Sequence, residues 1–309
     1  MKYYSLAEII DMLRKRVLLA EIETDISPVL EASEIADRFA CDGIQSKPLL
    51  FLQNGTEFPL LMNLFANKDL TDELLHLCGA DGYHSRVSEL LSMMDSKPRL
   101  ARKSIRSLMG LRKTAPEKLH HKGACMAVVQ PAPDLNLLPV IQCWPYDGGR
   151  FLTLPMVHTI DPDTGQQNTG MYRMQVFDGQ STGMHWHRHK GGAAHFEAWK
   201  KKGKRMPVTV TLGGDPVLTY AATAPLPEGI SEYMLAGFLK NKRVPLVKSH
   251  NSDIWIPECS DFVIEGYIDP SEPLRTEGPF GDHTGFYSLP DAYPVFHITR
   301  ISHRKKAVY

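Results

Sequence analysis

The feature that most constrains the fold of this 309-residue chain is a long series of short β-rich segments, divided by proline and glycine, which begins near residue 125. Two stretches within this series, at about 191–201 and 230–240, have helical spacing instead. Many strands with few helices favour a barrel or a sandwich. The predicted strands cover residues 127–130, 140–144, 151–160, 172–177, 183–189, 208–212, 245–248, 254–257, 262–268 and 295–301.

The first third of the chain has the pattern of a small α/β unit. Ser5 opens a capping-box pattern, and apolar residues follow it at helical spacing. Further helices are predicted at about 28–39, 70–79 and 84–95. Two short apolar runs, 49–53 and 60–64, flank the turn signal Asn54-Gly55 and predict a hairpin.

A basic stretch, residues 97–122, separates the two patterns. It carries nine lysines and arginines against a single acid, Glu117. It has no interleaved aromatic stripe of the kind that binds nucleic acids. Because charge runs usually face water, we interpret it as a solvated basic helix and connector. The predicted domains are therefore residues 1–118 and residues 119–309.

Charge and composition exclude several classes of protein. The 35 basic and 35 acidic residues cancel, so the chain lacks the positive field of a non-specific nucleic-acid binder. Its longest apolar runs are too short to span a bilayer, and its first residues do not read as a signal peptide. Five cysteines without a C-x-x-C pair indicate buried, reduced thiols and a cytoplasmic protein.

Two segments in the strand-rich part carry candidate functional side chains. Arg173 is a lone arginine whose fork would suit a carboxylate, although, taken alone, a surface or ion-paired arginine explains it better. His185, His187 and His189 alternate along a predicted strand, so their side chains would share one face. Three imidazoles on one face fit either a zinc site or a polar surface, and the residues alone leave both open.

Three acids are further candidates. Glu232 falls in the first turn of a predicted helix, where a carboxylate is favourable in any case. Glu277 and Asp282 lie five residues apart in a loop rich in glycine and proline. Such a loop can hold paired acids in a fixed geometry and separate their pKa values, or it can simply expose them to water.

Six motifs occur in one order along the second part of the chain. Together they resemble the UbiD family of prenylated-FMN-dependent decarboxylases, most closely the 3-polyprenyl-4-hydroxybenzoate decarboxylases. The likeness is clear from about residue 125 onward and fainter before it. The motifs are Asn168…Tyr172-Arg173, His185-Trp186…His189-Lys190-Gly191-Gly192, Leu-Pro-Glu-Gly-Ile-Ser-Glu232, Val-Pro-Leu-Val-Lys248, Asp-Ile-Trp-Ile-Pro257 and Glu277-Gly-Pro-Phe-Gly-Asp282-His-Thr-Gly285.

The resemblance implies an α+β fold, with a small N-terminal α/β domain followed by a flavin-reductase-like split β-barrel that binds prenylated FMN. It also implies that Asn168, His189 and Glu232 hold a divalent metal, usually Mn²⁺, which binds the cofactor phosphate; K⁺ is a further candidate ion. An amide oxygen, an imidazole and a carboxylate suit Mn²⁺. The implied cofactor contacts are Met171, Tyr172, Arg173, His185, Trp186, His187, Lys190 and Gly191.

The catalytic group implied by the resemblance is an acid–arginine–acid network of Arg173, Glu277 and Asp282. Arg173 would orient the carboxylate of an aromatic or α,β-unsaturated acid. Asp282 matches the usual proton donor, and Glu277 would tune the arginine. A general acid near neutral pH needs a raised pKa, which burial beside the flavin could provide. The implied substrate is a 4-hydroxybenzoate-type quinone precursor, with smaller phenolic acids or a naphthoate also open.

Two departures from the family affect these expectations. Members typically continue past the position of Tyr309 into a C-terminal domain that mediates oligomerisation, so we expect a homo-oligomer only in a full-length form. His185 and Lys190 stand where close relatives have arginines, and lysine lacks the arginine fork.

The remaining expectations concern partners, location and rival functions. A flavin prenyltransferase would supply the cofactor. The protein would be cytoplasmic, and peripheral to the membrane if its substrate is prenylated. The alternatives are an oxidoreductase that binds ordinary FMN and a non-catalytic subunit of a UbiD-like assembly. Retention of the acid–arginine–acid positions favours the decarboxylase.

Overall fold

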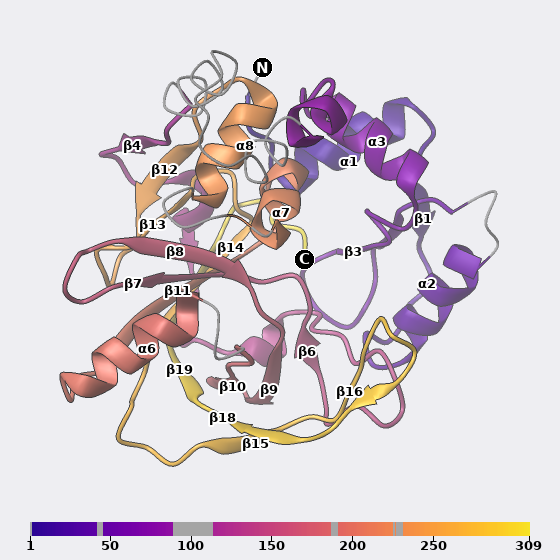
Figure 1. The fold of residues 1–309 in the computed structure, drawn as a ribbon. Coiled ribbons are helices and arrows are strands. Elements are labelled where there is room, and N and C mark those ends of the chain that lie inside the picture. The colour runs from indigo at the N-terminus through magenta and orange to yellow at the C-terminus, as the bar shows by residue number, and fades with distance from the viewer. Residues whose placement is uncertain (1, 42–45, 89–113, 187–190, 225, 227–230) are drawn as a thin grey trace.

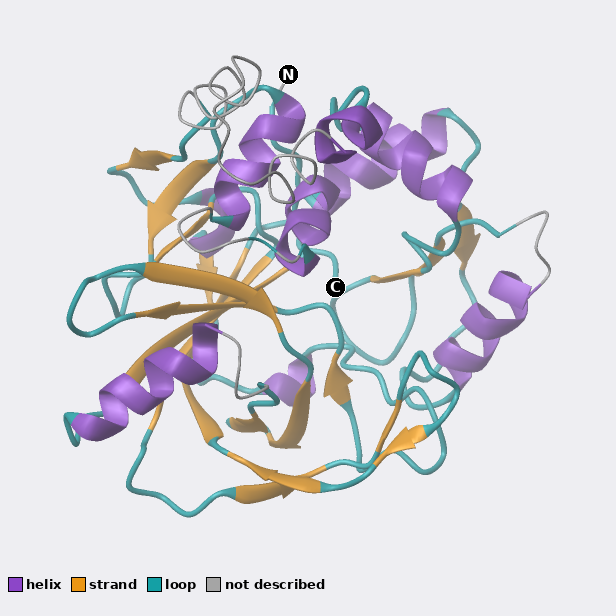
Figure 2. Ribbon diagram, in the orientation of Figure 1, coloured by secondary structure: helices purple, strands orange, loops and turns teal. Residues whose placement is uncertain are grey.

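The computed structural model describes residues 2–41, 46–88, 114–186, 191–224, 226 and 231–309. In this part of the chain the fold is mixed α+β, with one large curled sheet and helices both above and below it in the view (Figures 1 and 2).

The large sheet follows the order β6-β9-β10-β19-β14-β11-β7-β8, and β5 pairs with β19. All of its pairings are antiparallel, and the two longest join β14 to its neighbours β11 and β19. It curls into a half-barrel (Figure 1). Its strands are β5 (Val128–Val129), β6 (Phe151–Leu152), β7 (Met156–Ile160), β8 (Gln167–Met171), β9 (Met174–Asp178), β10 (Ser181–Gly183), β11 (Met206–Leu212), β14 (Phe262–Ile268) and β19 (Val295–His303).

Apolar side chains from these strands form the largest core of the described chain. Val208 and Val210 of β11 and Ile264 of β14 are buried in it, together with Phe262 and Phe296. The alternation of residues along each strand explains this arrangement, since every second side chain faces the inside of the curl. Burying each of these side chains stabilises the fold by about 1.5–3 kcal/mol.

The N-terminal unit is a three-stranded sheet with helices around it. Its order is β1-β2-β3, with β1 parallel and β3 antiparallel to β2, which confirms the predicted hairpin. Ser5 and Glu8 form the predicted capping box. The predicted helix at 28–39 starts three residues later, after Leu30, whose φ is 71°. The elements are α1 (Leu6–Lys15), β1 (Ala20–Ile22), α2 (Glu31–Cys41), β2 (Leu49–Phe51), β3 (Leu60–Met62) and α3 (Lys68–Leu77).

Two helices above the sheet connect the N-terminal unit with the rest of the chain. Ile9 and Leu13 of α1 share a core with α7 (Pro216–Thr223) and α8 (Glu232–Lys240). Lys240 also forms a fully buried ion pair with Asp215, the N-cap of α7, at 2.5 Å. The C-terminal residue Tyr309 completes the connection, since its backbone bonds to both Pro59 and Leu61.

Part of the basic stretch is a strand, contrary to the prediction of a helix and connector. β4 (Glu117–Leu119) pairs in parallel with β12 (Pro245–Lys248), whose other neighbour is β13 (Trp255–Pro257). Lys118 lies over the Trp255 ring, 4.8 Å from its centroid. This pairing partner is distant in the sequence, so the local charge pattern could not reveal it. Residues 97–113 lie outside the described residues.

Two other predicted segments differ from the structure. The predicted strand at 140–144 forms only isolated bridges, because the N–H groups of Val140 and Trp144 bond to the nearby Leu138 carbonyl and Asp147 carboxylate and not to a neighbouring strand. The predicted thiols are free, but Cys41 is exposed rather than buried.

A buried carboxylate joins three distant segments. Asp261 accepts hydrogen bonds from the backbone of Leu6 at 3.0 Å, Gly214 at 2.9 Å and Val308 at 3.4 Å. Burial raises the pKa of Asp261 to about 6, although these N–H groups and Arg304 oppose the rise.

We expect Asp261→Asn to cost less stability at pH 7 than at pH 4. The pKa of about 6 in the folded chain lies above the usual 3.8, so the folded state binds the extra proton. This contribution is complete below pH 4 and is lost as pH rises through 6, a difference of about 2 kcal/mol. Denaturant unfolding of both proteins at the two pH values measures it. An equal cost at both pH values would contradict the buried-carboxyl interpretation.

Candidate active site

Arg173 and Glu277 come from two neighbouring segments, a connection within the large sheet and a strand of a small two-stranded ribbon. Arg173 lies in the turn between β8 and β9, and Glu277 is the last residue of β15. Gln175 of β9 connects this part of the large sheet with the segment that follows Glu277. Its amide oxygen accepts from the Gly278 N–H at 2.7 Å, and its amide nitrogen donates to the Gly148 carbonyl at 2.6 Å. The small ribbons here are β15 (Arg275–Glu277), β16 (Phe280–Gly281), β17 (Tyr287–Ser288) and β18 (Asp291–Tyr293).

The Glu277 carboxylate is buried and contacts two nitrogen groups. Arg173 Nε donates to Oε1 at 3.1 Å, and His185 Nδ1 lies 2.6 Å from Oε2. Only 1% of the Glu277 side chain is exposed. Arg173 Nη2 donates to Ser288 Oγ at 3.0 Å, and the guanidinium lies 4.6 Å from the Phe280 ring centroid. The guanidinium is thereby fixed on three sides.

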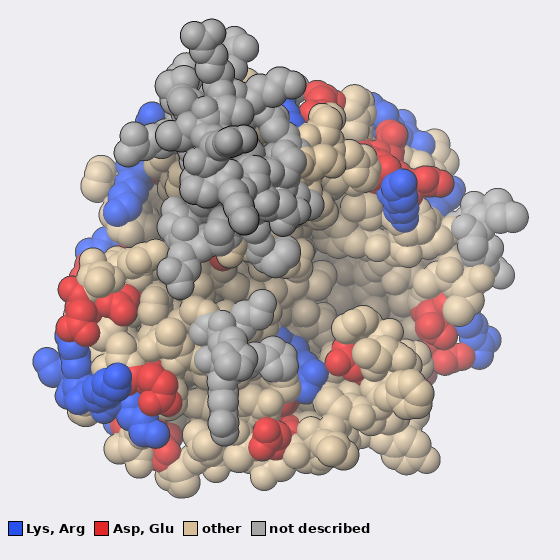
Figure 3. Space-filling model, in the orientation of Figure 1, with Lys and Arg blue, Asp and Glu red and all other residues tan. Residues whose placement is uncertain are grey.

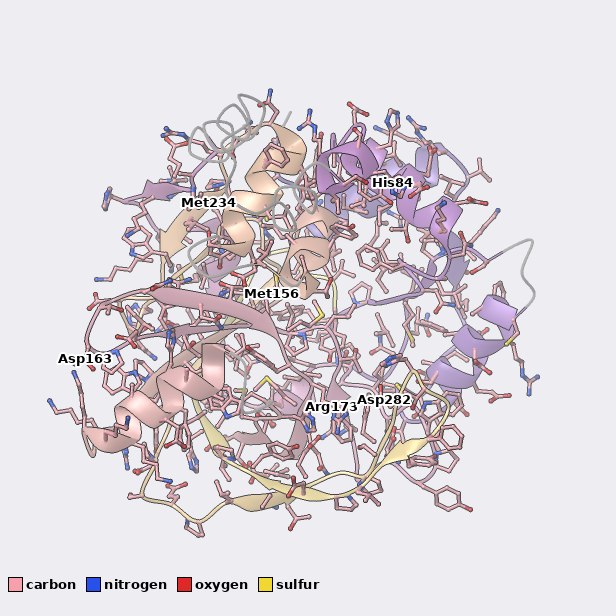
Figure 4. All side chains as sticks on the ribbon, in the orientation of Figure 1. His84, Met156, Asp163, Arg173, Met234 and Asp282 are labelled. Atoms are coloured by element: carbon pink, nitrogen blue, oxygen red, sulfur yellow. The ribbon has the colours of Figure 1, made fainter. Side chains whose placement is uncertain are left out.

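Asp282 lies beside Arg173 (Figure 4) and is about one-third exposed. Burial alone would raise its pKa. Hydrogen bonds from the backbone and ring of His283, together with the positive charge of Arg173, nevertheless lower it. The structure therefore brings together the three side chains of the predicted acid–arginine–acid network. It does not give Asp282 the raised pKa of a neutral-pH acid, so that shift would have to come from the flavin and the substrate.

Asn168 and Glu232, the two described residues of the predicted metal set, also lie close together. Asn168 is on β8, and Glu232 is the first residue of α8. Both lie near Tyr172: burial raises the pKa of this tyrosine, the neighbouring Asn168 side chain opposes the rise, and the Glu232 charge adds to it. Burial also raises the pKa of Glu232 to about 7, against a hydrogen bond from the Thr169 backbone.

The space around Asn168 fits a ligand-binding amide. Its Nδ2 atom is buried and has no hydrogen-bond partner among the described residues. At Gly191, which starts α6 (Gly191–Lys201), a Cβ atom would lie 2.2 Å from Asn168 Oδ1. Only glycine at this position therefore lets the start of the helix pack directly against the amide. An amide oxygen and a desolvated carboxylate are donors that suit Mn²⁺, so this donor set fits the predicted metal.

A buried histidine that the sequence did not single out, His158, joins three strands and one helix of this region. His158 of β7 bonds to Thr169 of β8 at 3.0 Å, Thr211 of β11 at 2.9 Å and Tyr233 of α8 at 2.9 Å. Burial lowers the pKa of His158 to about 3, so the ring is neutral. Thr169 and Tyr233 are the sequence neighbours of Asn168 and Glu232. Nothing local in the sequence distinguishes His158 from an ordinary core residue.

We expect His158→Leu to destabilise the fold by about 2–4 kcal/mol, because it leaves three buried hydroxyl groups without their partner. If the predicted metal set binds a metal, the variant should also retain less of it, since Asn168 and Glu232 lose their alignment. Thermal unfolding and elemental analysis measure the two effects. Unchanged values for both would contradict this role.

The predicted strand at 183–189 ends earlier than expected. β10 stops at Gly183, and Met184 N bonds to the carbonyl of Pro294, which has no N–H with which to continue the ladder. His185 and Trp186 therefore lie beyond the strand. The zinc site was predicted from three histidines that alternate along one strand, and His185 does not meet this condition. No group of three His, Cys, Asp or Glu among the described residues could hold a metal. The predicted residues His187, His189 and Lys190 lie outside the described residues.

A cavity of about 360 Å³ lies between the N-terminal unit and the large sheet. Figure 3 shows the molecular surface hollowed in this part of the visible face. Its lining is mainly apolar and includes Leu60, Phe65, Leu154 and Tyr309.

No helix in the described part of the chain is both long and apolar enough to cross a membrane.

Comparison with known families identifies the fold. The family model of the 3-octaprenyl-4-hydroxybenzoate carboxy-lyase Rift-related domain matches residues 117–309, and that of the N-terminal domain matches residues 10–97. The chain belongs to the UbiD family. This confirms the resemblance stated from the motifs.

Curated UbiD relatives are longer than this chain. An uncharacterised protein of Archaeoglobus fulgidus is 43% identical over 311 residues, and the match covers 100% of this chain and 63% of the relative. An uncharacterised protein of Aquifex aeolicus is 37% identical over 310 residues, covering 100% of this chain and 64% of the relative. The chain thus spans less than two thirds of either relative.

Solved UbiD-class structures share the fold. HmfF of Pelotomaculum thermopropionicum, in complex with FMN, superposes with a TM-score of 0.83 at 22% identity, over 99% of this chain and 64% of that one. Vanillic acid decarboxylase of Sedimentibacter hydroxybenzoicus in its closed form gives 0.84 at 22% identity, over 100% and 64%. These matches confirm the mixed α+β part of the predicted fold. The split-barrel description stays a prediction.

Proposed function

We propose that this chain carries the cofactor-binding and catalytic residues of a non-oxidative decarboxylase that uses prenylated FMN. The observation that carries the proposal is the buried Arg173–Glu277 pair with Asp282 beside the arginine. An enzyme that only reduces or oxidises FMN does not need an arginine held between two acids.

Arg173 is the group that would bind the substrate carboxylate. Its Nε and Nη2 atoms are engaged by Glu277 and Ser288, and Nη1 has no hydrogen-bond partner among the described residues. A guanidinium fixed in this way binds a carboxylate without losing further side-chain entropy. Glu277 would tune the arginine, and Asp282 would donate the proton that replaces carbon dioxide.

Prenylated FMN, when bound, supplies the electron sink that decarboxylation requires. Asn168, His189 and Glu232 would hold Mn²⁺ for the cofactor phosphate, and K⁺ stays a further candidate. The buried, unpartnered amide of Asn168 and the close approach of Gly191 support this assignment. Met171, Tyr172 and Trp186 would contact the flavin, with Tyr172 and Trp186 buried next to each other at 6.3 Å between ring centroids.

The substrate class follows from the same site. A single orienting guanidinium fits a monocarboxylic aromatic or α,β-unsaturated acid, and we place a 4-hydroxybenzoate-type quinone precursor first. Structural neighbours include decarboxylases of vanillic acid and of 3,4-dihydroxybenzoic acid, which supports a phenolic acid. We further infer a cytoplasmic protein that receives its cofactor from a flavin prenyltransferase. As a full-length form it would be a homo-oligomer.

Co-expression with a flavin prenyltransferase tests this function. The absorbance spectrum and mass of the released ligand should show prenylated FMN, and the purified protein should release carbon dioxide from a panel of phenolic and cinnamic acids. If the released ligand is unmodified FMN and the protein has oxidoreductase activity, the decarboxylase proposal is wrong and the oxidoreductase alternative is correct. Absence of any flavin would favour a non-catalytic subunit.

A further inference from the structure

Glu277 is shared between two nitrogen groups, and the second of them is a histidine. His185 Nδ1 lies 2.6 Å from Glu277 Oε2, which is shorter than the 3.1 Å from Arg173 Nε to Oε1. Both partners are themselves largely buried, with 14% of the His185 side chain and 13% of the Arg173 side chain exposed. Water therefore competes weakly for these contacts.

The imidazole is held in place by its surroundings. His185 follows two residues after the end of β10 at Gly183, and a Cβ atom at Gly183 would lie 3.1 Å from Glu277 Cγ. The Tyr293 ring of β18 lies against the imidazole, with 4.4 Å between centroids and a tilt of 37°. The chain thus brings the histidine close to Glu277 and supports one face of its ring.

We propose that His185 is a positioning residue which fixes the Glu277 carboxylate and, through it, the Arg173 guanidinium. The catalytic role of His185 rests on the proposed function, whereas the contacts of His185 with Glu277 do not depend on that function. A carboxylate only accepts hydrogen bonds, so contact with Glu277 places the imidazole proton on Nδ1. Charge-assisted bonds of this kind are short and strongly directional.

The arrangement also separates the roles of the two acids. With Arg173 on Oε1 and His185 on Oε2, Glu277 cannot carry a proton for transfer without giving up one of these donors. Asp282 is more exposed, at 34%, and its carboxylate is bonded only to the neighbouring His283 among the described residues. Proton donation therefore falls to Asp282, and His185 keeps Glu277 in its tuning role.

Nuclear magnetic resonance of the protein labelled with ¹⁵N in histidine and at arginine Nε tests the positioning without any turnover. The His185 signals should show a proton on Nδ1, and the Arg173 Nε–H should exchange slowly with solvent. In His185→Ala that exchange should become at least about tenfold faster, as expected when a supporting partner is lost. His185→Asn places an amide N–H near the Nδ1 position and should restore slow exchange.

His297→Ala is the matched control, because His297 also pairs with a glutamate, Glu272, at 2.6 Å but on the surface. It should leave the Arg173 exchange unchanged. An unprotonated Nδ1 in the wild-type protein, or unchanged Arg173 exchange in His185→Ala, would overturn the proposal. The first observation needs no variant, so it decides the question even if His185→Ala does not fold.

Kinetics of the cofactor-loaded protein then test the catalytic meaning. His185→Ala should lower kcat by about 10–100-fold with little change in KM, and His185→Asn should recover most of the rate. A raised KM with unchanged kcat would mean that His185 contacts a ligand directly and would overturn the positioning role. If the wild-type protein released no carbon dioxide, the proposed function would fail while the resonance result still decided the geometry.

Discussion

The Glu277→Gln variant, loaded with its cofactor, is expected to release carbon dioxide about 10³-fold more slowly than the wild-type protein while keeping its flavin. Glutamine presents one amide nitrogen, which would face either Arg173 Nε or His185 Nδ1, and both of these atoms now contact carboxylate oxygens. The arginine would lose its orientation without any change in the metal region. Asp282→Asn should have a comparable effect, because it removes the proton that replaces carbon dioxide.

Carbon dioxide release and the ratio of flavin to protein, measured on the same samples, separate catalysis from binding. Glu272→Gln is the control, since this glutamate also pairs with a histidine but lies on the surface. Loss of flavin from Glu277→Gln, with no separate catalytic defect, would show that the acid serves binding only. Full activity of Glu277→Gln would show that Glu277 has no role in catalysis.

The second large effect is expected at the metal region. Asn168→Ala or Glu232→Ala should remove the proposed Mn²⁺ and with it most of the bound flavin, because each removes one of the proposed ligands. Asn168 Nδ2 has no hydrogen-bond partner among the described residues, so Asn168→Ala breaks no hydrogen bond at that atom.

Elemental analysis and flavin absorbance of the purified variants measure this loss. Glu197→Ala is the matched control, since Glu197 is an exposed acid on α6 near the same region. Manganese content equal to that of the wild-type protein in Asn168→Ala and Glu232→Ala would refute the metal assignment. The flavin contacts could then still be tested separately through Tyr172 and Trp186.

Local patterns predicted much of the fold. Residues 191–201 and the hairpin around Asn54 form where the spacing and the turn signal placed them. The helix α7 was missed although its start carries a signal, Asp215 as N-cap followed by Pro216 at the first turn. The ribbons β15 to β18 were missed because their segments of two or three residues are too short for any periodicity to appear.

The site was less accessible to sequence reasoning because it depends on distant contacts. Glu277 and His185 are 92 residues apart, and His158 reaches Tyr233 across 75 residues. No spacing rule links such pairs. The motifs placed Arg173, Glu277 and Asp282 in one network only through resemblance, and the structure supplies the distances. It also moves His185 from a predicted strand to a position against Glu277.

A crystal structure of the chain purified after co-expression with a flavin prenyltransferase tests the central claim most directly. We expect a prenylated flavin whose phosphate end lies at Asn168 and Glu232 with a metal ion, and whose ring lies under Arg173, Glu277 and Asp282. A flavin bound elsewhere, or a ring from which those three side chains point away, would contradict it.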